Sequence, residues 1–178
     1  EKILNKIVKY GEISYDDIVI EIGPGKGNLT EKILEKKPHK LIVIEKDEDL
    51  SKILKKKYGN KLTIVNKDIL ECYNDFKYEA PIKIFGNLPY NISTKILISY
   101  LKLENLNKLV KKFIFIFQKE VAERIVAEKN SKNYGRLSIL CKWKVESFKA
   151  FDIDPKYFFP IPKVWSSLIV LQPKLKYQ

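Results

Sequence analysis

Short apolar runs recur along the chain, and segments whose apolar residues follow helical spacing lie between them. The apolar runs predict buried strands at 17–22, 41–44, 62–65, 82–85, 113–117 and 168–171. The spacing elsewhere predicts the end of a helix at 3–8 and further helices at 28–37, 48–57, 93–103 and 119–128. Segments 137–143 and 145–151 follow without an assigned type. Strands that alternate with helices predict an α/β fold, a mostly parallel sheet covered by helices on both faces.

The composition fits one folded domain over residues 1–178. Hydrophobic residues make up 45% and aromatic residues 12% of the 178 residues, which excludes a disordered chain. No apolar run approaches the ~20 residues of a membrane-spanning helix, and the first residues lack a secretory signal. No methionine is present, not even an initiator, so we expect the chain to be a piece of a longer protein.

Cysteine and histidine are too scarce for a disulfide scaffold or a metal site. Cys72 and Cys141 are isolated in sequence, and no Cys/His spacing suggests zinc. The single histidine, His39, follows a proline in a predicted surface turn. We therefore expect no metal, and we expect a reducing compartment.

The chain carries a formal charge of +12, almost entirely from lysine. Such a charge attracts polyanions, and nucleic acid or ribosomes are the expected partners. An AT-rich genome also favours lysine codons, so codon bias is a second explanation of the basic composition.

A glycine-rich loop follows the first strand and precedes a helix. Gly23, Gly25 and Gly27 alternate after Glu21, which lets the backbone turn sharply and approach a ligand closely. Glu45 ends the next strand about 20 residues later, where nucleotide-binding α/β domains place the residue that reads ribose hydroxyls.

The loop favours S-adenosylmethionine over a dinucleotide. Asn28 occupies the position of the third glycine in the dinucleotide pattern, and Asp68 adds a second acidic group at a strand end. Carboxylates suit the ammonium and sulfonium of S-adenosylmethionine. An NAD site, or an ordinary turn beside solvated charges, remains the alternative.

The sequence Asn-Leu-Pro-Tyr at 87–90 ends the fourth strand, where α/β sheets bind their ligands. The Asn87 amide oxygen and the Leu88 carbonyl can accept the two N–H groups of an adenine amine, because Pro89 prevents a following helical turn. These acceptors favour the positively charged transition state of methyl transfer. Tyr90 can stack on the base. The alternative is a turn that closes the strand, with Tyr90 as packing.

An aromatic and proline-rich stretch at 157–163 precedes the last strand. The prolines stiffen this loop, so one of its rings can be presented outward as the opposite face of a base sandwich. Core packing is the alternative for each ring.

These motifs together resemble the ribosomal RNA adenine N6-dimethyltransferase family, of bacterial or organellar type. The resemblance runs from Asp17 to Pro173 and rests on segments 21–30, 44–47, 66–70, 86–94, 117–124, 134–138 and 158–167. It implies the seven-stranded, Rossmann-like fold of S-adenosylmethionine-dependent methyltransferases, with six parallel strands and the last strand inserted antiparallel.

The resemblance also implies a cofactor site, made of Glu21, Gly23, Gly25, Gly27, Glu45, Lys46, Asp68, Ile69 and Asn87. Glu21 would lie near the methionine end and Glu45 at the ribose hydroxyls. Asp68 and Ile69 would contact the adenine of the cofactor.

The catalytic residues implied by the resemblance are Asn87, Leu88, Tyr90 and Phe158. Asn87 would lie between the cofactor and the target amine, and Tyr90 and Phe158 would stack on the flipped base. Two segments of the family, an N-terminal segment that covers the cofactor and a C-terminal helical subdomain, are expected to be absent here. Trp165 departs from the family pattern, which has an acidic or polar residue there.

The implied function is transfer of methyl groups from S-adenosylmethionine, with S-adenosylhomocysteine as product, to N6 of two adjacent adenosines near the 3′ end of small-subunit ribosomal RNA. The expected partner is the immature small ribosomal subunit, and we expect a monomer without membrane contact, in the cytoplasm or in an organelle. One alternative is the large-subunit adenine methyltransferase of macrolide resistance, and another is a non-catalytic RNA-binding assembly or transcription factor.

Overall fold

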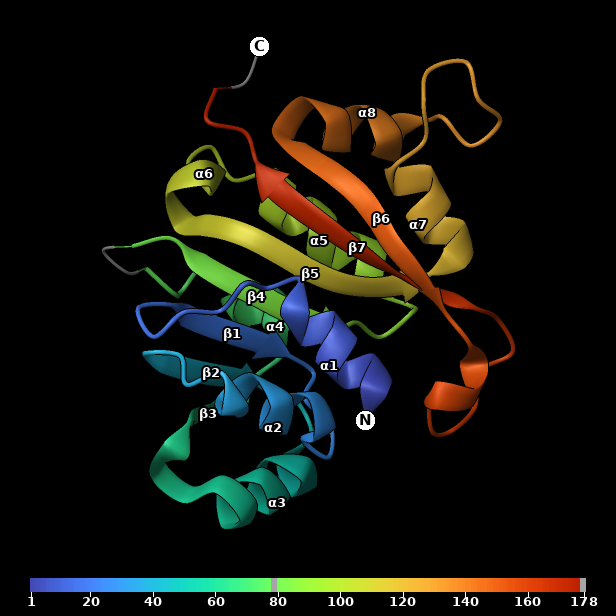
Figure 1. The fold of residues 1–178 in the computed structure, drawn as a ribbon. Coiled ribbons are helices and arrows are strands. Elements are labelled where there is room, and N and C mark those ends of the chain that lie inside the picture. The colour runs from blue at the N-terminus through green and yellow to red at the C-terminus, as the bar shows by residue number, and fades with distance from the viewer. Residues whose placement is uncertain (78–79, 177–178) are drawn as a thin grey trace.

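A seven-stranded sheet organises the chain (Figure 1). The computed structural model describes residues 1–77 and 80–176. The strand order is β3-β2-β1-β4-β5-β7-β6. The strands are β1 (Ile18–Ile22), β2 (Lys40–Ile44), β3 (Thr63–Val65), β4 (Ile82–Asn87), β5 (Val110–Gln118), β6 (Val145–Ile153) and β7 (Ser166–Pro173).

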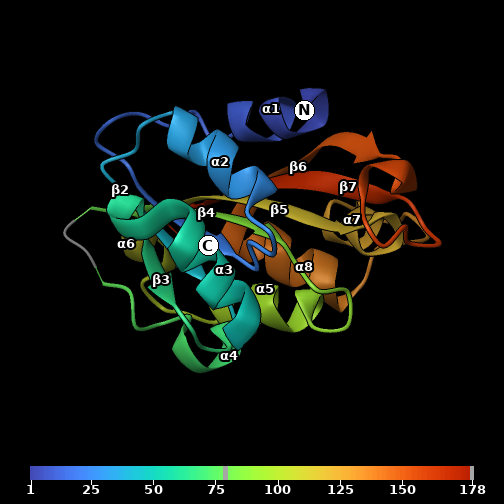
Figure 2. The same cartoon turned by 90° about the horizontal axis from the view of Figure 1, so that it is seen from below.

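Helices cover both faces of this sheet (Figure 2). The first face carries α1 (Lys2–Lys9), α2 (Asn28–Glu35) and α3 (Glu48–Tyr58). The second face carries α4 (Ile69–Cys72), α5 (Ser93–Leu101), α6 (Leu106–Leu109), α7 (Lys119–Ile125) and α8 (Arg136–Lys144). Two short 3-10 turns, η1 (Gly59–Lys61) and η2 (Pro155–Tyr157), lie in the connections.

The predicted strand directions are confirmed. Strands β3, β2, β1, β4 and β5 pair in parallel, and β7 pairs antiparallel with both β5 and β6. Strand β6 therefore points the same way as β5, so six strands share one direction and only β7 opposes them. This is the inserted antiparallel strand that the resemblance implied.

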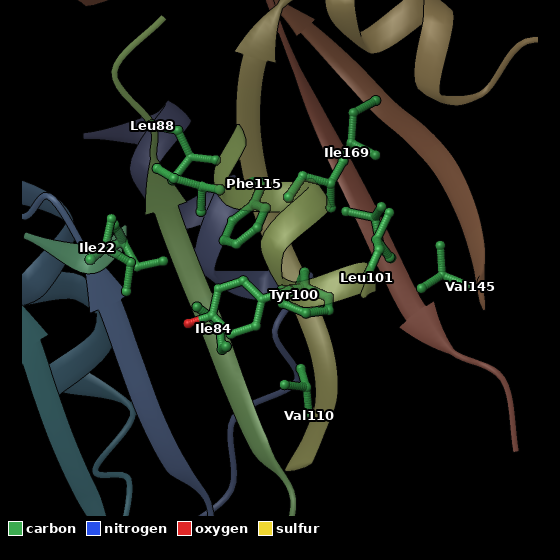
Figure 3. Packing of buried hydrophobic residues seen from close by; sticks show 14 of the residues in the cluster. Ile22, Ile84, Leu88, Tyr100, Leu101, Val110, Phe115, Val145 and Ile169 are labelled. Carbon is green, nitrogen blue, oxygen red and sulfur yellow. The ribbon is translucent and has the colours of Figure 1, made fainter. Parts of the chain in front are cut away.

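Side chains of each strand alternate between two hydrophobic layers. In β5, Phe113, Phe115 and Phe117 face the α4–α8 layer, whereas Ile114 and Ile116 face the α1–α3 layer. Figure 3 shows Phe115 and Tyr100 packed against neighbouring strand and helix residues in the α4–α8 layer. A strand buried on both faces reads as an uninterrupted apolar run, which is why 113–117 was recognisable from sequence.

Several boundaries differ from the sequence prediction. Strand β4 continues through Gly86 to Asn87, because its pairing with β5 extends to Ile116. The unassigned segments 137–143 and 145–151 fall in helix α8 and strand β6. The short helices α4 and α6 were not predicted, since four residues are too few to show a helical period.

The histidine and cysteine predictions can be compared directly with the structure. His39 lies exposed in the bend before β2, as expected. Cys72 and Cys141 are both buried and unpaired. Burial raises the pKa of Cys141 to about 12.

Two buried lysines fasten the α1–β1 connection to the sheet. The Lys83 ammonium donates to the Asp17 carboxylate at 2.8 Å and to the Glu12 carbonyl at 2.7 Å. The Lys112 ammonium donates to the Glu12 carboxylate at 2.6 Å and to the Tyr10 carbonyl at 3.1 Å. These contacts fix the point from which α1 extends over the sheet.

We expect the Lys83–Asp17 pair to matter far more for stability than an exposed pair of equal length. Lys83→Met leaves a largely buried carboxylate unpaired, so unfolding should become easier by about 3 kcal/mol. Lys52→Met is the matched control, because Lys52 meets Glu48 at the same 2.8 Å with both side chains exposed. It should change stability by less than about 0.5 kcal/mol. Urea unfolding measures both, and equal losses would contradict the prediction.

Candidate active site

The carboxyl ends of β1 and β4 meet at the centre of the sheet and begin the site. Successive connections leave these two strands in opposite directions along the sheet, which is where open α/β sheets bind ligands. The pairing of Ile22 with Gly86 places Gly23 beside Asn87. A β-carbon on Gly23 would lie 3.7 Å from the Asn87 carbonyl oxygen.

The glycine loop is held in shape by α3. Gly23, Gly25 and Gly27 all have positive φ, the left-handed region that favours glycine. Gly27 is packed tightly, because an added β-carbon would lie 2.9 Å from both Leu54 and Tyr58. The Tyr58 hydroxyl also donates to the Gly27 carbonyl at 2.8 Å. Gly27 therefore fixes the loop, whereas Gly23 and Gly25 line the cavities described next.

Two adjoining cavities open at this edge of the sheet. The larger, of about 620 Å³, is lined by α1, the glycine loop and the 157–159 segment. The smaller, of about 380 Å³, is lined by Glu45, residues 87–90 and the 158–162 loop. Five residues line both cavities: Gly23, Gly25, Asn87, Phe158 and Phe159.

Glu21 supplies a buried carboxyl to the larger cavity. It is 2% exposed and accepts a hydrogen bond from the Thr30 hydroxyl at 2.5 Å. Burial, with a smaller contribution from the neighbouring Glu45, raises its pKa to about 8, against the opposing effect of the Thr30 hydrogen bond. A cation in the cavity would favour the ionised form of this carboxyl.

Glu45 is bound to the glycine loop. Its Oε2 accepts from the Gly25 N–H at 3.2 Å, and its Oε1 accepts from the Asp47 N–H at 2.9 Å. Asn66 holds the strand end in place by donating to the Glu45 carbonyl at 2.8 Å. The carboxylate is thus oriented toward the smaller cavity by backbone groups alone.

Asn87 occupies the boundary between the two cavities. It is the last residue of β4, and its side chain is exposed. Leu88 after it is 2% exposed and anchors the turn in the core. The turn closes on the Pro89 carbonyl, which accepts from the Ile92 N–H at 3.1 Å.

Tyr90 and Phe158 line the smaller cavity from two different parts of the chain. The Tyr90 hydroxyl lies 2.5 Å from the Ser166 Oγ, at the start of β7, so the ring is fixed at its far end. Phe158 is half-buried and packs against the α1–α3 layer, whereas Phe159 is 92% exposed. Of these two rings, only Phe158 is held by packing in an oriented position.

One known family matches this sequence over nearly its whole length. The profile of the family described as ribosomal RNA adenine dimethylase matches residues 1–177. The chain belongs to this family.

Relatives within the family are close in sequence. The ribosomal RNA small subunit methyltransferase A of Pelagibacter ubique is 47% identical over 173 residues, which are 97% of this chain and 66% of that protein. This chain thus spans just under two thirds of that relative's length.

Solved structures agree with the fold. The dimethyladenosine transferase of Plasmodium falciparum has a TM-score of 0.86 and 34% identity, over 97% of this chain and 62% of that one. The 23S rRNA methyltransferase ErmE has a TM-score of 0.85 and 24% identity, over 99% of this chain and 69% of that one. At that identity the second match shows the methyltransferase fold alone.

Three residues predicted for the adenine dimethylase site stand apart from both cavities. Asp68 accepts from the Leu70 N–H at 2.9 Å and caps α4, and its other oxygen meets the Lys46 ammonium at 3.1 Å. Both contacts lower the pKa of Asp68. Ile69 is buried behind it. Lys46, Asp68 and Ile69 remain predictions as cofactor residues.

Sequence reasoning missed two contributions to the site. Ile3, Leu4 and Ile7 of α1 line the larger cavity, although an amphipathic helix gives no sign of what its apolar face covers. Ser166 positions Tyr90 from a distance of 76 residues in the chain. Its place after the Pro-Lys-Val segment was visible, but its partner was not. Among residues 1–77 and 80–176, no group of three His, Cys, Asp or Glu side chains could hold a metal.

We expect Glu21→Gln to stabilise the protein increasingly as pH rises from 5 to 8. The pKa of Glu21 is about 8 in the folded chain against an ordinary 4.5, so unfolding releases a proton in this range and stability falls as pH rises. Glutamine keeps an acceptor for Thr30 and removes the ionisation, for a gain of up to roughly 4 kcal/mol at pH 8. Urea unfolding at pH 5, 6.5 and 8 measures this. A gain independent of pH would contradict it.

Proposed function

We propose that this chain transfers methyl groups from S-adenosylmethionine to N6 of two adjacent adenosines near the 3′ end of small-subunit ribosomal RNA. The observation that carries the proposal is the position of Asn87. This residue lines both a larger cavity suited to the cofactor and a smaller aromatic cavity suited to a base. A group that positions the target amine for an incoming methyl must reach both.

The larger cavity fits S-adenosylmethionine in size and chemistry. Its volume of about 620 Å³ lies within the usual range of small-molecule sites. The buried Glu21 carboxyl suits an ammonium group, and the apolar residues of α1 suit uncharged atoms. Glu45 lines the adjoining smaller cavity, so the ribose of the cofactor would extend past Gly25 to reach this carboxylate, which the Gly25 and Asp47 N–H groups hold in place. When bound, S-adenosylmethionine supplies an electrophilic methyl group.

The chain's own residues would orient the acceptor. The Asn87 amide oxygen and the Leu88 carbonyl accept the two N–H groups of the adenine amine and hold its lone pair toward the cofactor cavity. These acceptors interact more strongly with the positively charged transition state than with the neutral amine, which lowers the barrier. Tyr90 and Phe158 stack on the base and exclude water from it.

The small-subunit target is favoured over the large-subunit alternative. The Pelagibacter relative named for the small subunit shares 47% of residues, whereas the large-subunit enzyme ErmE shares 24%. The third possibility, an RNA-binding factor without catalysis, predicts decay of the site. Against it, Glu21, Glu45 and Asn87 all line the cavities.

The formal charge of +12 supports RNA as the partner, in the form of the immature small subunit. No helix within the described part of the chain combines the length and apolarity needed to cross a bilayer. A monomeric state and a cytoplasmic or organellar site of action remain predictions.

The decisive experiment compares under-methylated small subunits with protein-free large-subunit RNA as substrates for the full-length protein. Mapping of the modified bases should find two adjacent dimethyladenosines near the 3′ end of the small-subunit RNA. Methylation of the large-subunit RNA alone would favour the rival enzyme. Absence of methyl transfer together with absence of cofactor binding by calorimetry would favour the non-catalytic factor.

We expect Glu45→Ala to weaken binding of S-adenosylmethionine by ~1–3 kcal/mol, because charge-assisted hydrogen bonds to the ribose are lost. Calorimetry measures the change. Glu48→Ala, an exposed carboxyl at the start of α3, is the control and should leave the affinity unaltered. An unchanged affinity in Glu45→Ala would remove Glu45 from the site.

We expect Asn87→Ala to lower turnover by ~10²–10³ while cofactor affinity stays nearly intact, because the amide acts mainly in the transition state. Tyr90→Ala should instead weaken base capture by ~1–3 kcal/mol, through lost stacking. Single-turnover methylation at varied substrate concentration separates the two effects. A near wild-type rate in Asn87→Ala would refute the proposed positioning of the amine.

A further inference from the structure

A third cavity, of about 410 Å³, is lined by the loop before β7 and by the start of α7, and a tryptophan forms part of its wall. Trp165 and Lys163 line it from the loop before β7, and Lys119, Glu120 and Glu123 line it from the start of α7. Trp165 is the residue at which the chain departs from the family pattern.

Hydrogen bonds fix the backbone around Trp165, whereas its indole ring has no bonding partner among the described residues. Its carbonyl accepts from the Lys119 N–H at 2.9 Å, and the next residue, Ser166, pairs with both β5 and β6. The side chain is 47% exposed. No ring contact and no hydrogen bond of the indole is formed with any residue in the described ranges. A large aromatic side chain held in place beside a cavity is available to a ligand.

One loop connects this cavity to the base cavity. The 158–162 part of the loop lines the smaller cavity, which we call the base cavity, and Lys163 to Trp165 line the third cavity. Ser166, the residue after Trp165, contacts the Tyr90 hydroxyl. Residues of the two cavities are therefore consecutive in one loop, and Trp165 is the chain neighbour of the residue that holds Tyr90.

The residues that line the third cavity suit a nucleotide whose base lies in the cavity. An indole stacks on any base. Lys163 forms no ion pair with the described residues and is free to meet a phosphate, whereas Lys119 already meets Asp152 at 3.4 Å. Glu120 and Glu123 repel phosphate but accept from exocyclic amines, which guanine, adenine and cytosine carry and uracil lacks.

We propose that Trp165 and its cavity form a second stacking site, for an unpaired base that carries an amino group and neighbours the target adenosine on the same RNA strand. The proposal rests on the proposed function, since it extends the RNA path of that site. Trp165 would act on RNA capture and not on methyl transfer itself.

The test titrates the full-length protein with an RNA stem-loop that contains the target adenosines. Trp165→Leu, which keeps an apolar side chain but loses the stacking face, should weaken RNA binding about 5- to 150-fold. Trp165→Phe should retain most of the affinity. Trp143→Leu is the matched control, because Trp143 is 50% exposed on α8, outside this cavity. It should bind RNA like the wild type.

A second arm tests the base preference. Uridine is substituted, one position at a time, for each unpaired base beside the target. At one RNA position, the change to uridine should weaken RNA binding by the wild-type protein at least fivefold. The same change should have little effect on RNA binding by Trp165→Leu, which has already lost the stacking site. Additive effects at every position would overturn the proposal.

The outcomes separate this inference from the proposed function. Equal RNA affinity of Trp165→Leu and Trp165→Phe would overturn the stacking site, while wild-type methylation and cofactor binding would leave the function standing. Weaker binding of Trp165→Leu to assembled subunits but not to protein-free RNA would assign the indole to a ribosomal protein and overturn the proposal. Failure of the wild type to methylate would instead refute the function, and the RNA titration would still report on Trp165.

Discussion

The parallel pairing of β1 with β4 is the constraint on which the site depends. The two strands are more than 60 residues apart in the chain, yet their register sets Gly23 against Asn87. One strand thus leads into the glycine loop, and the other ends at Asn87, which lines both cavities. A shift of one residue in this pairing would turn Asn87 to the opposite face of the sheet, because side chains alternate along a strand.

The antiparallel strand β7 and the loop before it complete the wall of the smaller cavity, which the end of β4 begins. Its first residue, Ser166, is paired on both sides and fixes the hydroxyl of Tyr90. The loop that leads into β7 carries Phe158 to the other wall of the base cavity. Figure 1 shows this segment between β6 and β7 at the same end of the molecule as the N-terminus of α1. The base cavity is therefore assembled from elements that only the sheet brings together.

Buried charged groups near the sheet have two different roles. Lys83 and Lys112 are matched by acceptors from the α1–β1 connection, which offset the cost of burying their charge and fasten that connection to the sheet. Glu21 has a single hydroxyl donor and stays costly to ionise until a cation arrives. A buried carboxyl with so few donors beside a cavity is a feature of binding sites, because a ligand can provide the compensation that the protein lacks. The same burial that disfavours its charge gives the cavity selectivity for a positive group.

The sequence alone determined strands β1 to β5 and β7 and helices α1, α2, α3, α5 and α7, the inserted strand through its resemblance to the family, and the residues of the glycine loop and the Asn-Leu-Pro-Tyr turn. These features are local, since apolar period, glycine spacing and a proline act over a few residues. Only the tertiary structure decided that Asn87 lies between two cavities, that α1 lines one of them and that Ser166 holds Tyr90. It also separated Glu45, which lines a cavity, from Asp68, which is engaged by Lys46 and by its own helix. Contacts between residues 60 to 80 positions apart depend on strand register and on packing. The spacing of residues along the chain predicts neither, because it reports only on local structure.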